Sequence, residues 1–297
     1  MSIAEHLRIL RPRPGVLAFY DGRIEGQRFA PGANWVDDGA LSLGIASYAV
    51  VSGDQALVYD THVSLDHARA VRHAVEAEGA RQITVVLSHC HLDHVAGTEV
   101  FADCEVIACR KTYDHLSRDR HAIEQGKLSG GPAISPLILP TKVFDGEMRL
   151  LIGDTEVVLI EANIHSDDAV VLWLPQTRVL IAGDTVEDSV TYVGEPESFA
   201  LHLADIERLF VLEPSKVLPN HGAPEVIAKG GYDASLLTAT ADYIRWLMRL
   251  WDQPELAQMR LAEAIAPQLE AGSLTLWPPY EDVHRQNIKR TLAAGCG

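Results

Sequence analysis

The feature that most constrains this chain is a cluster of potential metal ligands that directly follows an apolar run. Residues 83–87 (Ile-Thr-Val-Val-Leu) form that run, which predicts a strand buried on both faces. Ser88 and then His89-Cys90-His91-Leu92-Asp93-His94 follow it. Imidazole and carboxylate groups are zinc ligands, and residues two apart in a loop at a strand end can point the same way. We therefore expect His89 and His91 to share one ion while Asp93 and His94 face a second; a surface loop rich in histidine by chance is the alternative.

Three further donors each follow another expected strand. His165 comes after the strand expected at residues 156–161, Asp184 after residues 179–182, and His221 after residues 216–218. Open sheets present functional groups at the carboxyl ends of their strands, so these side chains are expected close to the first cluster. One such histidine alone is more often structural, and it is the set that indicates a shared site.

The rest of the pattern predicts a strand-rich chain that ends in helices. Residues 47–52 and 55–60 flank Gly53-Asp54, as in a hairpin. Apolar side chains recur at helical spacing over residues 64–78. Further strands are expected at residues 105–109, 148–152 and 169–174, and helices at residues 198–211, 233–251, 254–269 and 280–292. Strands with intervening helices imply sheets covered by helices, in an α/β chain with a catalytic domain over residues 1–231 and a helical C-terminal extension over residues 232–297 packed on it.

Two segments show no regular pattern. Residues 21–44 carry no clear periodicity, and residues 126–141 contain Gly130-Gly131-Pro132 and two further prolines. Long irregular segments in a compact domain often line active sites, and ordinary surface loops are the alternative. Tyr192, which follows Asp184 in another irregular stretch, either reaches a substrate or packs in the core.

The segment from His89 to His94 is the H-x-H-x-D-H signature of the metallo-β-lactamase superfamily, which this chain resembles over about residues 47–222. The resemblance implies a four-layer αββα sandwich with two metals at one edge of its two sheets. It implies that His89, His91 and His165 hold the first metal. It likewise implies that Asp93, His94 and His221 hold the second, and that Asp184 bridges the two. Asp60 matches the aspartate that precedes the signature and is expected to orient a ligand, with a plain turn residue as the alternative.

Such a site favours hydrolysis. Two zinc ions lower the pKa of bound water from 15.7 towards about 7 and so supply a bridging hydroxide. The chain carries no G-x-S-x-G elbow, so this hydroxide is the expected nucleophile, with Asp93, Asp184 and Asp60 as the catalytic carboxylates.

True lactamases of the largest subclass carry a cysteine where this chain has Asp184, whereas a carboxylate there resembles lactonases, glyoxalase II, phosphodiesterases and sulfatases. We expect cleavage of a small, neutral or apolar-bodied carbonyl ester or lactone, with phosphodiesters second and β-lactams third.

Other activities stay open at this point. Residues 161–164, just before His165, lack the T-P-G pattern of glyoxalase II and the lactonases and look closer to relatives with an N-A-H-T version of the motif. Persulfide dioxygenases share the H-x-H-x-D-H signature but use one iron, so iron or manganese is the alternative to two zinc ions. A non-catalytic metal-binding module is the last alternative, although this ligand set leaves room for water.

Charge and composition limit the partners. Lys and Arg total 25 against 41 Asp and Glu, a net charge of −16, which repels phosphate backbones and anionic membranes. We therefore expect a small-molecule substrate and neither nucleic acid nor a membrane.

Residues 1–15 lack the apolar core of a signal peptide, and no C-x-x-C pairing is present, so a cytoplasmic location is expected. An apolar stripe in the helical tail either covers a sheet face or forms a homodimer interface; it comprises Trp246, Leu247, Leu250 and Trp251.

Overall fold

Two β-sheets lie at the centre of the protein, seen here in a computed structural model that describes residues 2–295. The first sheet has seven strands in the order β1-β2-β3-β4-β5-β6-β7, which run antiparallel from β1 to β4 and parallel from β4 to β7. Their bounds are β1 (Arg8–Arg13), β2 (Val16–Asp21), β3 (Ile45–Ser52), β4 (Gln55–Tyr59), β5 (Gln82–Val86), β6 (Glu105–Cys109) and β7 (Lys142–Phe144).

The second sheet has five strands in the order β12-β11-β10-β9-β8. All neighbours are antiparallel except β11 and β12, which are parallel. Their bounds are β8 (Glu147–Ile152), β9 (Thr155–Glu161), β10 (Val170–Leu174), β11 (Val179–Gly183) and β12 (Lys216–Pro219). The hairpin expected around Gly53-Asp54 is confirmed as the β3–β4 pair.

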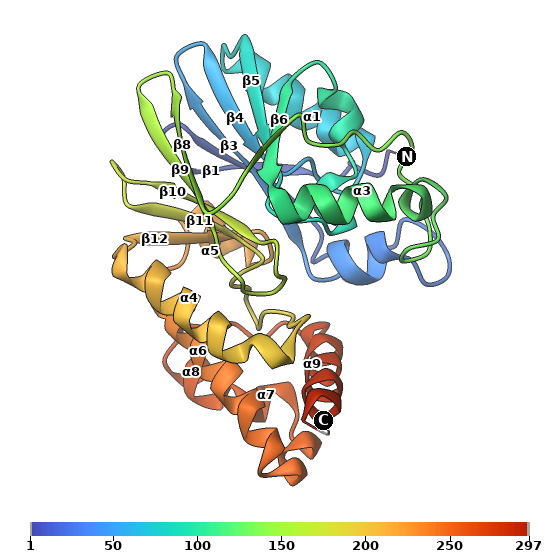
Figure 1. Cartoon of the computed structure of the whole chain (residues 1–297), viewed down its shortest axis with the longest axis vertical. Coiled ribbons are helices and arrows are strands. Elements are labelled where there is room, and N and C mark those ends of the chain that lie inside the picture. Colours follow the sequence, from blue (N-terminus) through green and yellow to red (C-terminus); the bar gives the residue numbers. More distant parts are fainter. Residues whose placement is uncertain (1, 296–297) are drawn as a thin grey trace.

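Alternation along the strands of the first sheet separates two apolar cores. In β4, Leu57 and Tyr59 belong to the core shared with the second sheet, whereas Ala56 and Val58 belong to the core under the outer helices. Successive side chains of a strand point to opposite faces, so one strand supplies both layers. Figure 1 shows the resulting arrangement, with α1 (Leu65–Ala77) and α3 (Arg110–Glu124) on the outer face of the first sheet.

The C-terminal helices gather at the other side of the second sheet, in the lower half of Figure 1. Phe199 and Ile206 of α4 and Leu236 of α6 share one core with the second-sheet residue Leu172. The fold is therefore the expected αββα sandwich with C-terminal helices. The helices and turns of this part are α4 (Phe199–Val211), α5 (Pro224–Ala228), α6 (Ser235–Met248), η4 (Arg249–Trp251), η5 (Pro254–Gln258), α7 (Leu261–Ala264), α8 (Ala266–Glu270) and α9 (Tyr280–Ala294).

One expected helix is wrong. Residues 254–269 form the 3-10 helix η5 followed by the short helices α7 and α8. Pro254 and Pro267 lie at the starts of η5 and α8. Proline lacks the amide hydrogen that a helix interior needs, so the chain restarts a helix at each proline instead of continuing one.

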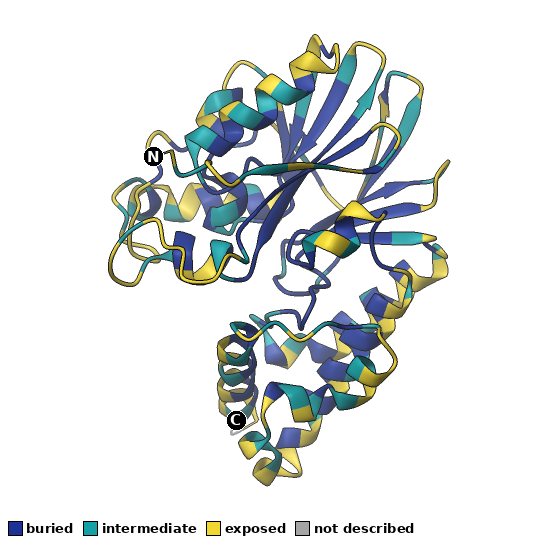
Figure 2. Ribbon diagram, turned by 180° about the vertical axis from the view of Figure 1, so that it is seen from behind, coloured by how far each residue is buried: buried dark blue, intermediate teal, exposed yellow. Residues whose placement is uncertain are grey.

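Several elements were not anticipated. In the β1–β2 hairpin, charged residues interrupt the apolar pattern of β1 only, whereas β2 is a continuous buried run that sequence reasoning missed. Helix α3 buries only Thr112, Leu116 and Ile123 and is otherwise polar. Burial of the expected strand before the signature is also uneven, because Val85 and Val86 of β5 are buried while Ile83 is half-buried. Figure 2 shows the same trend, with the strands dark and the outer faces of the helices exposed.

Within the described residues, no helix is both long and apolar enough to cross a membrane. Trp246, Leu247 and Leu250 of the helical tail are buried inside the chain, and Trp251 is 40% exposed. The stripe is therefore mostly internal packing, and a homodimer through it stays a prediction. Cys90, Cys104 and Cys109 are free thiols, whereas Cys296 lies outside the described residues.

Candidate metal centre

The signature segment leaves β5 at its carboxyl end and runs into the short helix α2 (Leu92–Val95). Leu92 and Val95 are buried in the core beneath the outer helices, so they anchor this turn to the interior. Asp168 fixes it from the side, because its Oδ2 accepts a hydrogen bond of 2.8 Å from the backbone amide of Cys90. These anchors leave the polar side chains at the sheet edge, where His89 and His94 are almost fully buried.

The later ligands arrive at the same edge from the second sheet. His165 follows β9, Asp184 follows β11, and His221 follows β12. Gly183 makes the turn before Asp184 possible: its φ is +59°, and a Cβ there would lie 2.7 Å from Tyr59 Oη. Only glycine adopts such a conformation without strain. The side chain of Asp184 is thereby brought into the centre of the cluster.

Asp184 Oδ2 lies within reach of four histidines. It is 3.6 Å from His89 Nε2 and 3.7 Å from His165 Nε2. It is also 3.1 Å from His94 Nε2 and 3.4 Å from His221 Nε2. One carboxylate oxygen therefore faces donors from both expected ligand groups.

The donors divide into the two groups expected from the sequence. His89, His91, His165 and Asp184 can converge on one ion, and Asp93, His94 and His221 on another. In the first group His165 Nε2 is 3.0 Å from His91 Nδ1. In the second, Asp93 Oδ2 is 3.5 Å from both His94 Nε2 and His221 Nε2. The structure thus brings all seven expected ligands together.

Three of these histidines have their second ring nitrogen held by a fixed neighbour. His94 Nδ1 lies 2.9 Å from Asp60 Oδ2, and His221 Nδ1 lies 2.7 Å from the carbonyl oxygen of Gly44. His89 Nδ1 lies 2.9 Å from Ser88 Oγ. Metal-binding histidines in general use the second nitrogen in this way, which fixes the tautomer and the ring orientation.

Asp60 is fully buried behind His94. Its Oδ1 accepts from the amide of Ser88 at 2.7 Å, and its Oδ2 accepts from Asn220 Nδ2 at 2.6 Å. The residue agrees with the expected orienting role. It lies against His94 and does not line the cavity above the cluster, and its orienting role stays a prediction.

Two residues of the site, the candidate ligand His165 and Asp60, which lies against the candidate ligand His94, adopt strained backbone conformations. Asp60 has a φ of 66° and His165 a φ of 72°. Non-glycine residues in this region cost roughly 1–3 kcal/mol each and cluster at functional sites. The fold therefore accepts backbone strain at two positions that both contact the cluster.

The electrostatics suit cation binding. Burial would lower the pKa of His94, but the carboxylates of Asp184, Asp93 and Asp60 raise it well above the usual value. Burial would raise the pKa of Asp184, but His94 and His221 hold it well below the usual range. Burial lowers the pKa of His91 to about 4. Asp184 is thus a charged acceptor and His91 a neutral donor of a lone pair, whereas His94 would give up its extra proton to a bound ion.

Unpaired atoms at the centre fit metal ions as well. His89 Nε2 and Asp184 Oδ1 are buried and have no hydrogen-bond partner among the described residues. A buried polar group without a partner costs free energy. Ions at the centre of the cluster would satisfy both atoms, and five imidazoles with two carboxylates are a donor set that zinc accepts.

A cavity of about 330 Å³ opens above the cluster. The two segments without a sequence pattern both contribute to its wall, through Trp35 and Leu43 of one and Leu128 of the other. Trp35 Nε1 donates to the carbonyl oxygen of Pro132 at 3.0 Å and so links the two segments. The interpretation of these segments as lining the site is confirmed, and the first also contains a π-helix, η1 (Val36–Leu41).

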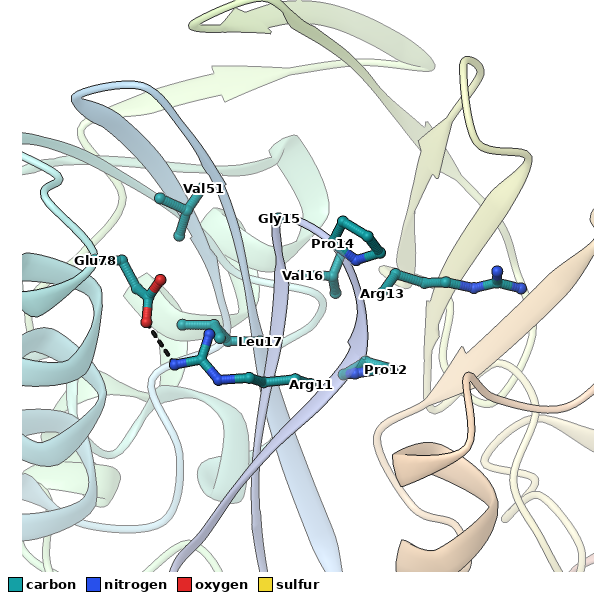
Figure 3. A pocket seen from close by; sticks show the side chains of 9 residues that line it. All are labelled: Arg11, Pro12, Arg13, Pro14, Gly15, Val16, Leu17, Val51 and Glu78. Carbon is teal, nitrogen blue, oxygen red and sulfur yellow. Dashed lines mark hydrogen bonds and ion pairs between the residues drawn. The ribbon is translucent and has the colours of Figure 1, made fainter.

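The hollow in Figure 3 is a separate feature. It lies at the turn between β1 and β2, where Arg11 pairs with Glu78 at 2.5 Å. None of the expected ligands lines it.

A third group of donors, His115, Asp167 and Asp168, lies beside Lys111, whose Nζ is 3.7 Å from Asp167 Oδ2. That ammonium already neutralises part of the negative charge there.

Sequence reasoning missed Glu187, which is 2% exposed and lines the cavity. Its Oε1 lies 3.4 Å from His165 Nδ1. Its place three positions after Asp184 was the available signal. Tyr192 is half-buried: it lines the cavity near His91 and His165 and also packs against the main core, so it lies between the site and the core.

Comparisons with known proteins agree with this geometry. Residues 42–221 match the family model of the metallo-beta-lactamase superfamily. Among solved structures, the chain is similar to the metallo-beta-lactamase DIM-1 exposed to ceftazidime (TM-score 0.59, 21% identity, 81% of this chain and 97% of that chain). It is also similar to a metallo-beta-lactamase from Pontibacter korlensis (TM-score 0.56, 17% identity, 78% of this chain and 99% of that chain). Likeness at this identity shows a shared fold.

A curated relative is the linear primary-alkylsulfatase of Pseudomonas sp. (strain ATCC 19151), 23% identical over 208 residues. The match covers 57% of this chain and 39% of that protein, so the chain spans about two fifths of its relative's length. The family model covers the segment from β3 to His221, which contains the signature and every expected ligand. On this match, and with the sandwich and the histidine–aspartate cluster in place, the chain belongs to the metallo-beta-lactamase superfamily.

Proposed function

We propose that this protein is a dinuclear zinc hydrolase that cleaves a small, neutral, apolar-bodied carboxylic ester or lactone. The observation that carries the proposal is the position of Asp184 Oδ2, between 3.1 and 3.7 Å from the Nε2 atoms of four histidines. A carboxylate in this position holds two cations close together. Bound there, two zinc ions would acidify a water molecule and stabilise developing negative charge.

Two groups of side chains would hold the two ions. His89, His91 and His165 would hold the first ion and Asp93, His94 and His221 the second, with Asp184 shared between them. Asp60, Ser88 and Gly44 fix the orientation of the rings of three of these histidines. Since the ligand side chains are held before any ion arrives, little reorganisation is needed on binding.

The cavity wall supports the choice of substrate. Its apolar members are Trp35, Leu43, Leu92, Leu128 and Val283. Among the described residues, no Lys or Arg lines it, and Asp38 and Glu187 add negative charge. Anionic ligands are usually held by Arg or Lys, so a carboxylate, phosphate or sulfate group would depend on the metals alone. A neutral acyl group or lactone ring meets no such cost.

The alkylsulfatase relative favours a second candidate, hydrolysis of an alkyl sulfate. The apolar wall suits an alkyl chain, but the lack of a lining cation disfavours the sulfate head. Phosphodiesters and β-lactams, which are also anionic, rank below the esters for the same reason. An iron-dependent oxygenase and a non-catalytic metal-binding module are the remaining alternatives.

The test is a panel of substrates offered to the zinc-loaded protein, with kcat/KM measured for each. The panel contains short and medium acyl esters, lactones, an alkyl sulfate, a phosphodiester and a β-lactam. We expect the neutral esters or lactones to give the highest kcat/KM, and the Asp184→Asn variant to lose that activity. A higher kcat/KM for the alkyl sulfate would replace the first candidate by the second. Metal analysis after growth in metal-balanced medium, giving one iron per chain, would overturn both.

A further inference from the structure

Glu187 stands between the cluster and the C-terminal extension. Its Oε1 accepts from the amide of Tyr192 at 3.0 Å and from Thr191 Oγ1 at 3.2 Å. Its Oε2 accepts from Tyr280 Oη at 2.9 Å. The remaining neighbour of Oε1 is His165 Nδ1, 3.4 Å away. A buried carboxylate with this many fixed donors has little freedom to move.

Glu187 completes a pattern among the histidines. His89, His94 and His221 each have Nδ1 held by a neighbour. For His165, Nδ1 has no shorter partner among the described residues, and Glu187 is the acceptor that it faces. A carboxylate on the second nitrogen of a ligating histidine fixes the ring and raises its basicity. His165 is the histidine that arrives on a strained backbone, with a φ of 72°, so its ring depends on such support.

The support for Glu187 comes from α9. Tyr280 is the first residue of this helix and is fully buried. Further along the same helix, Asn287 Oδ1 accepts from the amide of Val193 at 2.9 Å, and Asn287 Nδ2 donates to the carbonyl oxygen of Thr191 at 2.9 Å. The loop that carries Glu187 is thus hydrogen-bonded to α9 at Glu187 and again at Thr191 and Val193.

We propose that Glu187 is a positioning residue for His165 and that Tyr280 holds it in place. The helical C-terminal extension is therefore part of the metal centre and not only a cover for the second sheet. The inference rests on the proposed function, because it takes His165 to be a ligand of the first metal. It predicts that removing the Tyr280 hydroxyl, which bonds to Glu187 and not to a ligand, weakens one metal site and spares the other.

The experiment measures the two metal affinities separately, by titrating the metal-free full-length protein with Co²⁺ and with Zn²⁺ in the presence of a chromophoric chelator. In Glu187→Gln, the size is kept and the charge is lost. We expect first-site affinity to fall about 10–100-fold, the usual cost of losing an outer-shell partner, with second-site affinity unchanged. In Tyr280→Phe, only the hydroxyl is lost, and we expect a smaller fall confined to the same site.

Thr240→Val is the matched control, because it also removes one buried hydroxyl from the same extension. Thr240 lies on α6, and its Oγ1 donates to the carbonyl oxygen of Leu236 at 3.0 Å without contacting Glu187. This variant should lose similar stability and keep both metal affinities. The absorption spectrum of the Co²⁺ form gives a second readout, since the first-site bands should change in Glu187→Gln and in Tyr280→Phe only.

The outcomes separate the inference from the proposed function. If the native protein binds no metal, the proposed function fails. If the native protein binds two ions and Glu187→Gln leaves both affinities unchanged, the positioning role of Glu187 is wrong. Equal losses in Tyr280→Phe and Thr240→Val, or a loss spread over both metal sites, would show a general loss of stability and would overturn the part assigned to α9.

Discussion

Asp60 Oδ2 lies 2.9 Å from His94 Nδ1, on the side of the ring opposite Asp184, whose Oδ2 is 3.1 Å from His94 Nε2. One imidazole is therefore held between a buried carboxylate behind it and the shared carboxylate in front. A similar buried pair stands away from the cluster, where His67 Nε2 lies 2.9 Å from Asp21 Oδ2. The two pairs offer a direct comparison of a carboxylate that supports a ligand with one that does not.

Asp60→Asn should weaken the second metal site. The amide is the same size but carries no charge, so His94 loses an acceptor that fixes its tautomer. We expect second-site zinc affinity to fall about 10–100-fold, measured by chelator competition. Asp21→Asn removes a carboxylate from the other buried pair and should leave zinc affinity unchanged. Equal affinity in both variants would contradict the positioning role of Asp60.

Asp184→Asn should abolish most of the hydrolysis while the fold survives. The charge that faces both ligand groups is lost, so both ions bind less tightly and the spacing between them loosens. We expect kcat/KM to fall by more than about 100-fold, beyond the cost of losing an outer-shell partner, with the thermal midpoint of the metal-free protein little changed. Asp54→Asn, in the exposed turn between β3 and β4, is the matched control and should leave kcat/KM unchanged. Near-normal turnover in Asp184→Asn would remove this residue from the mechanism.

Metal stoichiometry should follow the two donor groups. The native protein should bind two ions per chain by elemental analysis, because seven donors converge in two groups. His89→Ala should lose mainly the first ion and His221→Ala mainly the second, each retaining about one. A single tight ion in the native protein, even with excess zinc, would exclude the dinuclear assignment.

Metal binding should release protons and weaken at low pH. In the absence of metal, burial would lower the pKa of His94 and of His221, but Asp184 and the neighbouring carboxylates raise both well above the usual value. Both rings are then protonated at neutral pH, and an ion must displace those protons. Zinc affinity should therefore rise as the pH increases through neutrality and fall below it. The check is calorimetric titration in buffers of different ionisation enthalpy; binding without proton release would contradict the pKa shifts.

A cation placed in the cavity wall should shift substrate preference. Gln286 lies on α9, is exposed and lines the cavity, so Gln286→Arg is tolerated sterically. The new charge can pair with an anionic substrate group. We expect the ratio of kcat/KM for a carboxylate-bearing ester to that for its neutral analogue to rise about tenfold, equivalent to about 1.4 kcal/mol. Gln286→Glu should move the ratio in the opposite direction. No change in either variant would show that substrates do not approach α9.

The sequence by itself predicted the strands and the convergence of the candidate ligands, and its resemblance to the superfamily predicted the layers. Two apolar runs around Gly53-Asp54 were enough to predict the β3–β4 hairpin, and the positions of His89, Asp184 and His221 after three different strands were enough to predict one shared edge. These predictions succeed because period, turn chemistry and ligand type are local properties of the chain. Where the local pattern is weak, as in the charged strand β1 or the polar helix α3, the same reasoning found nothing.

Only the tertiary structure decided what surrounds the ligands. Glu187 is separated from Tyr280 by 93 positions, and Asp60 from Asn220 by 160, so no pattern in the sequence pairs them. The cavity wall likewise combines Trp35, Leu128 and Val283 from three distant segments. Such contacts form because packing two sheets and a helical extension around one core brings remote loops to one edge. The candidate ligand set therefore follows from local sequence, whereas the contacts around His165 and the character of the cavity follow from how the layers pack.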